Sequence, residues 1–543
     1  MALTSLPALL AERAVAAPEA VILRRKDRGI WKPLRWRELA EQVAALAGAL
    51  ATDGFGPAMT GAILSDTRVE WVLADLAIQH AGGAAAGLSP LADAATVAAQ
   101  LRATGAVILF VENEEQLDKV LTARAACPAL RRIVVFDMKG LRDLDDAACI
   151  GLADFSAAPV APPHVAVDPD APAAIVFTEG SGRAVSLPHG RLAATIAAAT
   201  ARFGPAPGDE RLAVMPPAHT AERVLGLYLS LATGTITNFG ESADTIEGNL
   251  REAQPTVLLA APAQWKRFHD RIERAATGAS WLQRALFRRA MRLARRGGVL
   301  AARPVLGAVR RALGLARLRL ALIAGGTVAP ELIDWFRALG IDLVEIYGIA
   351  EAGGLAATPG RAAPPVAKLR LSAAGEIEIE VGGVWIATGD SGALEADVLT
   401  VNGRCADAIA GPDGRTIHPA PIESALRLSP FILDALVMPG ADSTLAAVLR
   451  LDPEAVEAWA HARRLVFTSY AALTALPELA ALLQTEIDRV NAGPARAMPI
   501  RAAHALDRRL AAGDPELTSL GALRRDAFAV ARRREPATTE ETP

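Results

Sequence analysis

The sequence contains very little cysteine. Cys127, Cys149 and Cys405 are the only three among 543 residues, and none of them shows C-x-x-C spacing. Neither a zinc site nor a disulfide framework is therefore indicated, and a reducing compartment fits. Aromatic residues make up only 4% of the chain against 52% hydrophobic residues, so the apolar content is mainly Ala, Leu and Val. Such a composition excludes a disordered chain and supports a large buried core.

Long apolar runs and a leader segment are also missing. No run of about 18 apolar residues, the length that a membrane-spanning helix needs, occurs anywhere in the chain. The N-terminal segment MALTSLPALLAERAVAAPEAV has no basic region before an apolar stretch, which is the order found in a signal peptide. These absences predict a cytoplasmic protein without a spanning helix.

Neither sign of charge is in large excess. The chain has 57 Lys plus Arg and 60 Asp plus Glu, so its formal charge is −3 and nothing in this balance calls for a nucleic acid partner. One segment departs from this neutrality: residues 281–320 hold eleven arginines and no Asp or Glu, in two helical pieces separated by Gly297, Gly298 and Pro304. Basic amphipathic helices lie on anionic membranes, which predicts peripheral contact at the inner face of a membrane. The alternative is a solvated helix face whose arginines pair with acids elsewhere in the fold.

From residue 36 to about 350, helical periodicity alternates with short apolar runs, which is typical of α/β layering. The runs that predict buried strands are 61–66, 107–111, 133–137, 173–177, 256–261, 320–326 and 343–348. We expect a large N-terminal domain of layered sheets flanked by helices over residues 1–402. Residues 156–172, rich in Pro and Ala, are expected to be a connector within it.

Beyond residue 400 the pattern changes to short strands and two helical stretches. This change predicts a small α+β C-terminal domain over residues 403–534. Residues 535–543 carry only Pro, Ala, Thr and Glu and are expected to be disordered. The predicted class of the whole chain is therefore α/β with a second, smaller α+β domain.

Three motifs carry polar side chains to the ends of predicted strands. EIYGIAEAGG places Tyr347 and Glu351 just past a buried strand, where α/β sheets bind ligands. WIATGDSGAL places Asp390 in a glycine-flanked turn, where a carboxylate can accept two ribose hydroxyls; a simple Asx-turn is the alternative. VNGRCADAI, with Arg404, follows directly.

The order and spacing of these motifs resemble those of the AMP-forming adenylating enzymes, and most closely the long-chain fatty acyl-CoA synthetase branch. Segments such as PPAHTAERVLGLYLSL and ELIDWFRALGIDLVEIYGIAEAGG look like that branch, and the resemblance covers nearly the whole chain. It implies a ligase that activates a fatty carboxylate with ATP and Mg2+ and transfers it to coenzyme A. It also implies a C-terminal domain that rotates between the two half-reactions, and a homodimer is compatible with it.

The same resemblance implies the roles of individual residues. Glu351, His219 and Arg183 would be catalytic, and Glu351 would also coordinate Mg2+. Ala406 occupies the hinge position between the domains. The implied nucleotide-binding residues are Thr178, Gly180, Ser181, Gly182, Gly325, Tyr347, Gly348, Asp390 and Arg404.

The chain departs from the family pattern at places that matter for chemistry. The phosphate loop is represented by residues 177–190, about three residues shorter than in the family, with Glu179 in place of a serine and Arg183 nearest to the Lys-Gly pair. The catalytic lysine position is Ala522, the threonine of the Y-G-x-T-E pattern is Ala350, and the segment before TGD is also shortened.

Two hypotheses follow from these departures. In the first, the protein is an acyl-CoA synthetase that still forms an adenylate, using Arg183 and a C-terminal arginine, Arg524 or Arg525, in place of the lysines. In the second, it is a catalytically impaired relative that binds an acyl chain or a nucleotide, or serves as a subunit of an assembly.

Overall fold

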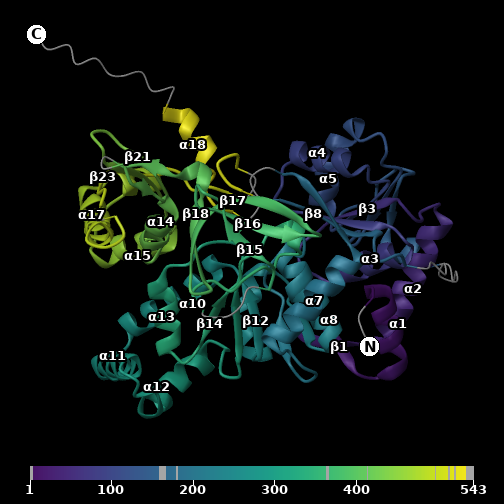
Figure 1. Ribbon diagram of the computed structural model, residues 1–543, viewed down its shortest axis with the longest axis horizontal. Helices are drawn as coiled ribbons and strands as arrows, with labels where there is room; N and C mark the ends of the chain where they lie inside the picture. The colour runs from purple at the N-terminus through teal and green to yellow at the C-terminus, as the bar shows by residue number, and fades with distance from the viewer. Residues whose placement is uncertain are drawn as a thin grey trace, which may run out of the picture.

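Two seven-stranded sheets form the larger part of the molecule (Figure 1). The computed structural model describes residues 4–157, 167–178, 182–361, 366–411, 414–495, 497–511, 514–518 and 521–532. The predicted tail, residues 535–543, lies outside the described residues. The predicted connector lies partly outside them, and β8 begins at its last residue, Pro172.

The first sheet has the order β7-β6-β5-β3-β4-β8-β9 and is parallel except for the hairpin of β8 and β9. Its strands are β3 Thr60–Leu64, β4 Ala84–Leu88, β5 Ile108–Val111, β6 Arg132–Val135, β7 Cys149–Gly151, β8 Pro172–Phe177 and β9 Ala184–Pro188. Its helices, with the N-terminal α1, are α1 Leu6–Ala16, α2 Trp36–Thr52, α3 Val69–His80, α4 Ala94–Thr104, α5 Glu114–Ala123 and α6 Leu152–Phe155, and a 3₁₀ turn covers Arg124–Ala126.

The second sheet repeats this arrangement in the order β14-β13-β12-β10-β11-β1-β2, again with one antiparallel hairpin, β1 and β2, at its edge. Its strands are β1 Val21–Asp27, β2 Ile30–Arg35, β10 Glu210–Leu212, β11 Ile236–Phe239, β12 Val257–Ala260, β13 Leu320–Ile323 and β14 Leu343–Glu345. Its helices are α7 His189–Phe203, the π-helix Glu222–Tyr228, α8 Leu229–Thr233, α9 Ile246–Ala253, α10 Pro262–Gly278, α11 Trp281–Arg295, α12 Val299–Ala312 and α13 Pro330–Ala338, with a 3₁₀ turn at Ala243–Thr245.

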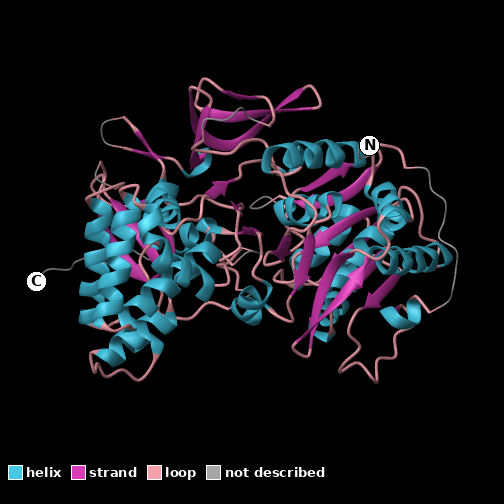
Figure 2. Ribbon diagram, turned by 90° about the horizontal axis from the view of Figure 1, so that it is seen from below, coloured by secondary structure: helices cyan, strands magenta, loops and turns pink. Residues whose placement is uncertain are grey.

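Burial explains why the predicted strands form. The residues of β3 to β5 and β12 are almost all buried, because helices cover both faces of a parallel sheet (Figure 2). Residues of both sheets, among them Phe110 and Leu322, belong to one continuous hydrophobic core. The predicted α/β class with layered sheets is therefore confirmed. None of the described helices is both long and apolar enough to cross a bilayer.

A smaller antiparallel sheet and a separate C-terminal unit complete the fold. The antiparallel sheet comprises β15 Leu369–Leu371, β16 Glu376–Val381, β17 Val384–Glu395 and β18 Val398–Arg404. The C-terminal unit comprises β19 Ile409–Ala410, β20 Thr416–Ile417, α14 Pro419–Arg427, β21 Ile432–Pro439, β22 Leu445–Leu451, α15 Pro453–Ala462, α16 Tyr470–Thr474, α17 Pro477–Asn491, β23 Ile500–Ala505 and α18 Arg525–Arg532. Short 3₁₀ turns cover Ala350–Ala352 and Cys405–Asp407.

Two of the predicted boundaries fall inside observed elements. The expected domain limit at residues 402 and 403 falls inside β18, because the pairing of β17 with β18 continues to Arg404. The separate core of the C-terminal unit begins at Ile409, so the break lies between these residues. In the basic segment, Gly297 and Gly298 separate the two helices as expected, but Pro304 lies inside α12 and does not end it.

Candidate active site

A cavity of about 730 Å³ lies beyond the carboxyl ends of β8, β13 and β14, and β17 and β18 form another wall. This is the edge where parallel sheets bind ligands. The structure brings together there most of the residues predicted from the sequence: Thr178, Arg183, His219, Gly325, Tyr347, Gly348, Glu351, Asp390, Arg404 and Ala406. Gly182 is described but does not line the cavity. Gly180 and Ser181, like Glu179, lie outside the described residues.

Asp390, Tyr347 and Arg404 form a hydrogen-bonded group on one wall. The Tyr347 hydroxyl lies 3.0 Å from Asp390 Oδ2 and 3.1 Å from Thr388 Oγ1. The Arg404 guanidinium lies 3.3 Å from Asp390 Oδ1 and donates to the Thr388 carbonyl at 2.9 Å. Burial raises the pKa of Asp390 above its ordinary value, although Arg404 and the tyrosine hydrogen bond act in the opposite direction. The carboxylate is thus oriented toward the cavity by two fixed neighbours.

The TGD segment lies in a strand rather than in the predicted turn. Residues 384–395 form β17, and Asp390 is the direct cross-strand neighbour of Arg404. Gly389 has a φ of +76°, which a glycine adopts without strain, and the pairing shifts register just beyond, between Ser391 and Gly392. The Asp–Arg contact therefore comes from strand pairing, which a local turn motif does not indicate.

The short phosphate-loop segment closes on itself. Thr178 N donates to the Arg183 carbonyl at 2.9 Å, Gly182 N donates to the Thr178 carbonyl at 3.0 Å, and Arg183 N donates to Thr178 Oγ1 at 3.1 Å. The loop is the end of the β8–β9 hairpin, in which Phe177 pairs with Ala184. The amides of its described residues are thus engaged inside the loop.

Arg183 pairs with Glu351 across the cavity. Its guanidinium donates to Glu351 Oε1, which ties the β8–β9 loop to the segment that follows β14. Glu351 is the carboxylate predicted to hold Mg2+, and in this structure a protein cation lies against it. No group of three His, Cys, Asp or Glu side chains in the described part of the chain surrounds a metal-sized space. One carboxylate nevertheless fits Mg2+, which proteins often hold with one or two carboxylates and substrate phosphates.

His219 and Gly325 lie face to face at the inner end of the cavity. The His219 ring accepts a hydrogen bond from Ala221 N at Nδ1, 3.2 Å away, so Nε2 carries the proton of the neutral ring. A Cβ atom on Gly325 would lie 3.1 Å from that Nε2, and Gly325 also has a φ of +85°. Gly325 therefore leaves room for the imidazole.

Sequence reasoning missed two ionisable residues of the cavity, Glu345 and Asp407. Glu345, the last residue of β14, lines the same cavity, and burial raises its pKa to about 7. The motif EIYGIAEAGG contained it, but its position at the end of a predicted strand was the only signal. A carboxyl with such a pKa can hold or release a proton near neutral pH.

None of the described residues from 506 to 532 lines the cavity. Ala522, at the position of the family's lysine, closes a turn with Thr518: Thr518 N donates to the Ala522 carbonyl at 2.7 Å. Arg525 pairs with Glu423 and with Asp407, and Arg524 pairs with Asp526. The two arginines considered as replacements for the lysine do not line the cavity themselves, although Asp407, one partner of Arg525, does.

Ala406, the predicted hinge residue, lies in the 3₁₀ turn Cys405–Asp407, directly after β18. The next residue, Asp407, lines the cavity and also contacts Arg525, with 3.2 Å between Oδ1 and Nε. The hinge position thus lies between the cavity and the C-terminal unit.

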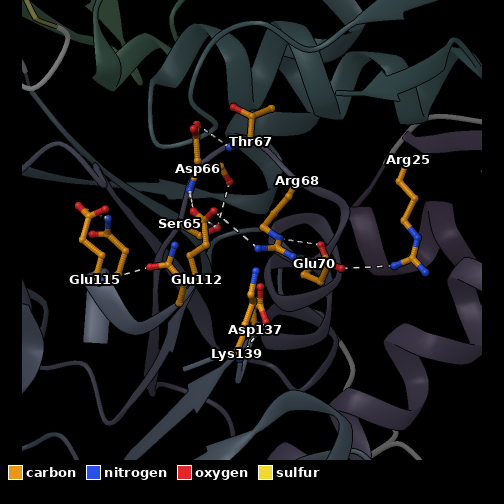
Figure 3. Close-up of polar contacts among 12 residues, drawn as sticks. Arg25, Ser65, Asp66, Thr67, Arg68, Glu70, Glu112, Glu115, Asp137 and Lys139 are labelled. Atoms are coloured by element: carbon orange, nitrogen blue, oxygen red, sulfur yellow. Dashed lines mark hydrogen bonds and ion pairs between the residues drawn. The ribbon is translucent and has the colours of Figure 1, made fainter. Parts of the chain in front are cut away.

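A second, strongly charged cavity of about 480 Å³ lies between the two large sheets (Figure 3). Arg68 donates to Glu70 at 2.8 Å and lies 3.6 Å from Glu112, and Glu70 also contacts Arg25 at 3.4 Å. Burial opposes the ionisation of Glu70, but the hydrogen bond and charge of Arg68 outweigh it and keep its pKa below the ordinary value. These charges satisfy one another, so the group joins the sheets and offers little to a ligand.

The comparisons with known proteins agree with this geometry. The profile of the AMP-binding enzyme family matches residues 10–379. The chain is 27% identical over 535 residues to the long-chain-fatty-acid–CoA ligase FadD15 of Mycobacterium bovis, covering 89% of this chain and 88% of that relative.

Two solved structures share the fold. The A domain of the carboxylic acid reductase from Segniliparus rugosus, in complex with AMP and a co-purified carboxylic acid, superposes with a TM-score of 0.76 at 19% identity, covering 97% of this chain and 92% of that one. The O-succinylbenzoate coenzyme A synthetase MenE from Bacillus subtilis, in complex with ATP and magnesium, gives 0.66 at 17% identity, with 96% and 99% covered. Because the profile covers well over half of the chain, the protein belongs to the family of AMP-binding enzymes.

Proposed function

We propose that the protein activates a carboxylic acid with ATP and transfers the acyl group to coenzyme A, and that a long-chain fatty acid is the carboxylate. The carboxylate attacks the α-phosphorus of ATP to form an acyl-adenylate and releases pyrophosphate. The thiol of coenzyme A then displaces AMP to form the thioester. The fatty-acid assignment follows the name of the relative FadD15, whereas the nucleotide chemistry follows the site itself.

The observation that carries this proposal is the convergence of Tyr347, Asp390 and Arg404 in one cavity. A buried carboxylate held between a hydroxyl and a guanidinium is suited to accept both hydroxyls of a ribose, as acidic residues do in other nucleotide sites. The Tyr347 ring then lies beside the adenine. Arg404 offsets part of the negative charge that the ribose and phosphates bring.

Glu351 and Arg183 are assigned to the phosphates. Glu351 would hold Mg2+ together with phosphate oxygens, and bound Mg2+ would supply charge neutralisation on the phosphates. Arg183 would exchange its contact with Glu351 for one with a phosphate oxygen, since guanidinium groups suit such oxygens. Preorganised cations of this kind stabilise charge that develops in a transition state.

His219 is assigned to the acyl end of the cavity. The imidazole lines the cavity and packs against the backbone of Gly325, where an added Cβ atom would crowd it. A neighbouring cavity of about 1050 Å³ shares Thr327, Glu345 and Val401 with the first. The two cavities together offer space for a substrate larger than the adenylate.

A catalytically impaired relative is the second candidate. Two features support it: the resemblance places the family's lysine at Ala522, and the described amides of the short loop bond within the loop. Such a protein would bind a nucleotide or an acyl chain, or act as an assembly subunit, without turnover. The two candidates share the ribose site and differ in pyrophosphate release.

Nucleotide binding is tested by thermal unfolding with AMP. At about a hundredfold excess over Kd, AMP is expected to stabilise the protein by about 2.7 kcal/mol. Asp390→Ala is expected to abolish this effect. Glu395→Ala, an exposed acid on the same strand, is the matched control and should keep it. Equal stabilisation of both variants would show that Asp390 does not hold the ribose.

Turnover is tested by pyrophosphate release with ATP, Mg2+, coenzyme A and fatty acids of several chain lengths. Release above a heat-killed control supports the ligase. AMP binding without pyrophosphate release supports the impaired relative. If the protein neither binds AMP nor releases pyrophosphate, the proposed nucleotide site is refuted.

A further inference from the structure

We propose that the outward face of α11 is a docking surface for an anionic lipid bilayer. We define this basic face as the exposed residues Trp281, Leu282, Leu286, Arg288, Arg289, Arg292, Leu293, Arg295 and Arg296. The inference does not depend on the proposed catalytic function, because the face lies outside the candidate active site. Figure 1 shows α11 and α12 at the lower left edge of the molecule.

The first observation concerns which groups the arginines contact. Of the eleven in residues 281–320, Arg319 pairs with Asp209 and Arg310 donates to backbone carbonyls such as those of Leu315 and Gly340. No ion pair between the other nine and a carboxylate is found in the described part of the chain, whereas arginines elsewhere, such as Arg35, Arg124 and Arg508, are ion-paired. A solvated face whose arginines pair with acids of the same fold, the alternative weighed from the sequence, is therefore not what the structure contains.

The second observation is the apolar content of the same face. Trp281 is 74% exposed, Leu282 52%, Leu286 47% and Leu293 37%. These four are among only ten large hydrophobic side chains exposed in the described chain, and all four lie in one helix of 15 residues. Clustered exposed apolar residues mark interaction sites, whereas scattered ones need no explanation.

The fold keeps this face rigid and directed outward. Phe287, Ala290, Met291 and Ala294, on the opposite side of α11, are buried in the core that includes Trp265 of α10. α11 is therefore fixed by its inner side, and Leu282 and Leu286 are about half exposed, although Leu293 also lies against Gly298. Substitutions on the outer side should leave the fold intact.

The pattern around the helix suits a membrane surface. At 100° per residue, Leu282, Leu286 and Leu293 fall within a narrow stripe, and Arg289 and Arg296 lie directly beside it. An amphipathic helix in the headgroup region inserts such a stripe, while the arginine stems reach the lipid phosphates. Tryptophan favours the same boundary between water and hydrocarbon. A nucleic acid would use the arginines but not the leucines, so a bilayer explains more of the face.

The test is co-sedimentation of the full-length protein with vesicles. Vesicles of phosphatidylcholine containing about 30% phosphatidylglycerol should bind it, and pure phosphatidylcholine should not. Binding should fall as salt rises from about 0.05 M to about 0.5 M, because headgroup attraction is screened. Equal binding to neutral vesicles, or binding insensitive to salt, would overturn the proposal.

Three variants localise the effect. Arg289→Gln, Arg292→Gln and Arg296→Gln combined should lower the partition constant on the order of a hundredfold, at about fivefold for each arginine. The matched control removes three exposed arginines elsewhere, Arg102→Gln, Arg131→Gln and Arg501→Gln, and should bind nearly as the parent does. Leu282→Gln with Leu286→Gln should also weaken binding, which charge attraction alone does not explain.

Two results would refute this assignment. An equal loss in the control triple would mean that only the net charge matters. Retention of a duplex nucleic acid through Arg289, Arg292 and Arg296, without binding to anionic vesicles, would identify the face as a nucleic acid surface.

Discussion

At the residue scale, Glu345 shows how burial alone changes the pKa of a carboxyl group. It follows two strand residues in a covered parallel sheet, and burial raises its pKa to about 7. Asp390 in the same cavity is also buried, but Arg404 and Tyr347 act against the rise in its pKa. Two carboxyls in one cavity thus have different affinities for a proton because only one of them has a guanidinium beside it.

Glu345 should make stability depend on pH. Between pH 4.5, the ordinary pKa of a glutamate, and about 7, the folded protein keeps a proton that the unfolded chain has lost. The free energy of unfolding therefore falls as pH rises through this range, by about 3 kcal/mol in total. In Glu345→Gln this decline should be absent, as measured by urea unfolding at several pH values. Glu395→Gln, at an exposed site, should behave like the parent, and an unchanged decline in Glu345→Gln would contradict the assignment.

At the element scale, two short segments determine what the site can do. Thr178 and Arg183, the described ends of the predicted phosphate loop, bond to each other at the β8–β9 hairpin. Thr518 bonds to Ala522, where the resemblance places a lysine, and neither residue lines the cavity. Because both segments differ from the family pattern, repairing one of them leaves the other unchanged.

Ala522→Lys is therefore expected to increase pyrophosphate release by less than about tenfold, although one well-placed charge is worth on the order of a hundredfold. Ala511→Lys, at an exposed position of the same C-terminal segment, is the control for added charge. A gain of a hundredfold or more in Ala522→Lys alone would mean that the loop is competent and only the lysine was lost.

The sequence predicted these elements unevenly. Continuous apolar runs predicted β3, β5 and β12 well, since strands covered on both faces need them. The three-residue strand β10 and the π-helix were missed, because Arg211, Glu222 and Arg223 interrupt the apolar pattern although all three are buried.

The candidate site was predicted from motif resemblance, and its contacts were not. Tyr347 and Asp390 are 43 residues apart, and no local pattern indicates that they share a hydrogen bond. Likewise, the ion pair of Arg183 and Glu351 joins the predicted phosphate loop to the motif EIYGIAEAGG. The sequence gives no sign that these two side chains contact each other.

At the scale of the whole molecule, buried charges join the two large sheets. Arg223 and Asp75 are ion-paired with 0% and 1% of their side chains exposed, and the Tyr228 hydroxyl donates to Asp75 Oδ2 at 2.7 Å. Asp75 belongs to α3 of the first sheet and Arg223 to the π-helix of the second. The pair therefore makes the two sheets one cooperative body.

Asp75→Asn should destabilise the protein by about 3–5 kcal/mol, because it leaves the Arg223 guanidinium buried without its counter-charge. Urea unfolding measures the loss. Asp334→Asn removes the acid of a surface pair with Arg337 and should cost less than about 1 kcal/mol. Similar losses in the two variants would mean that burial of the pair has no energetic importance.

The contact between Arg183 and Glu351 has a thermodynamic consequence. Glu351 Oε1 cannot serve a guanidinium and a divalent cation equally at the same time, so the two cations exclude each other there. In the proposed function, the phosphates of ATP would give Arg183 another partner and release the carboxylate. Under these roles, magnesium affinity and ATP affinity are expected to rise together, by the same factor in each direction.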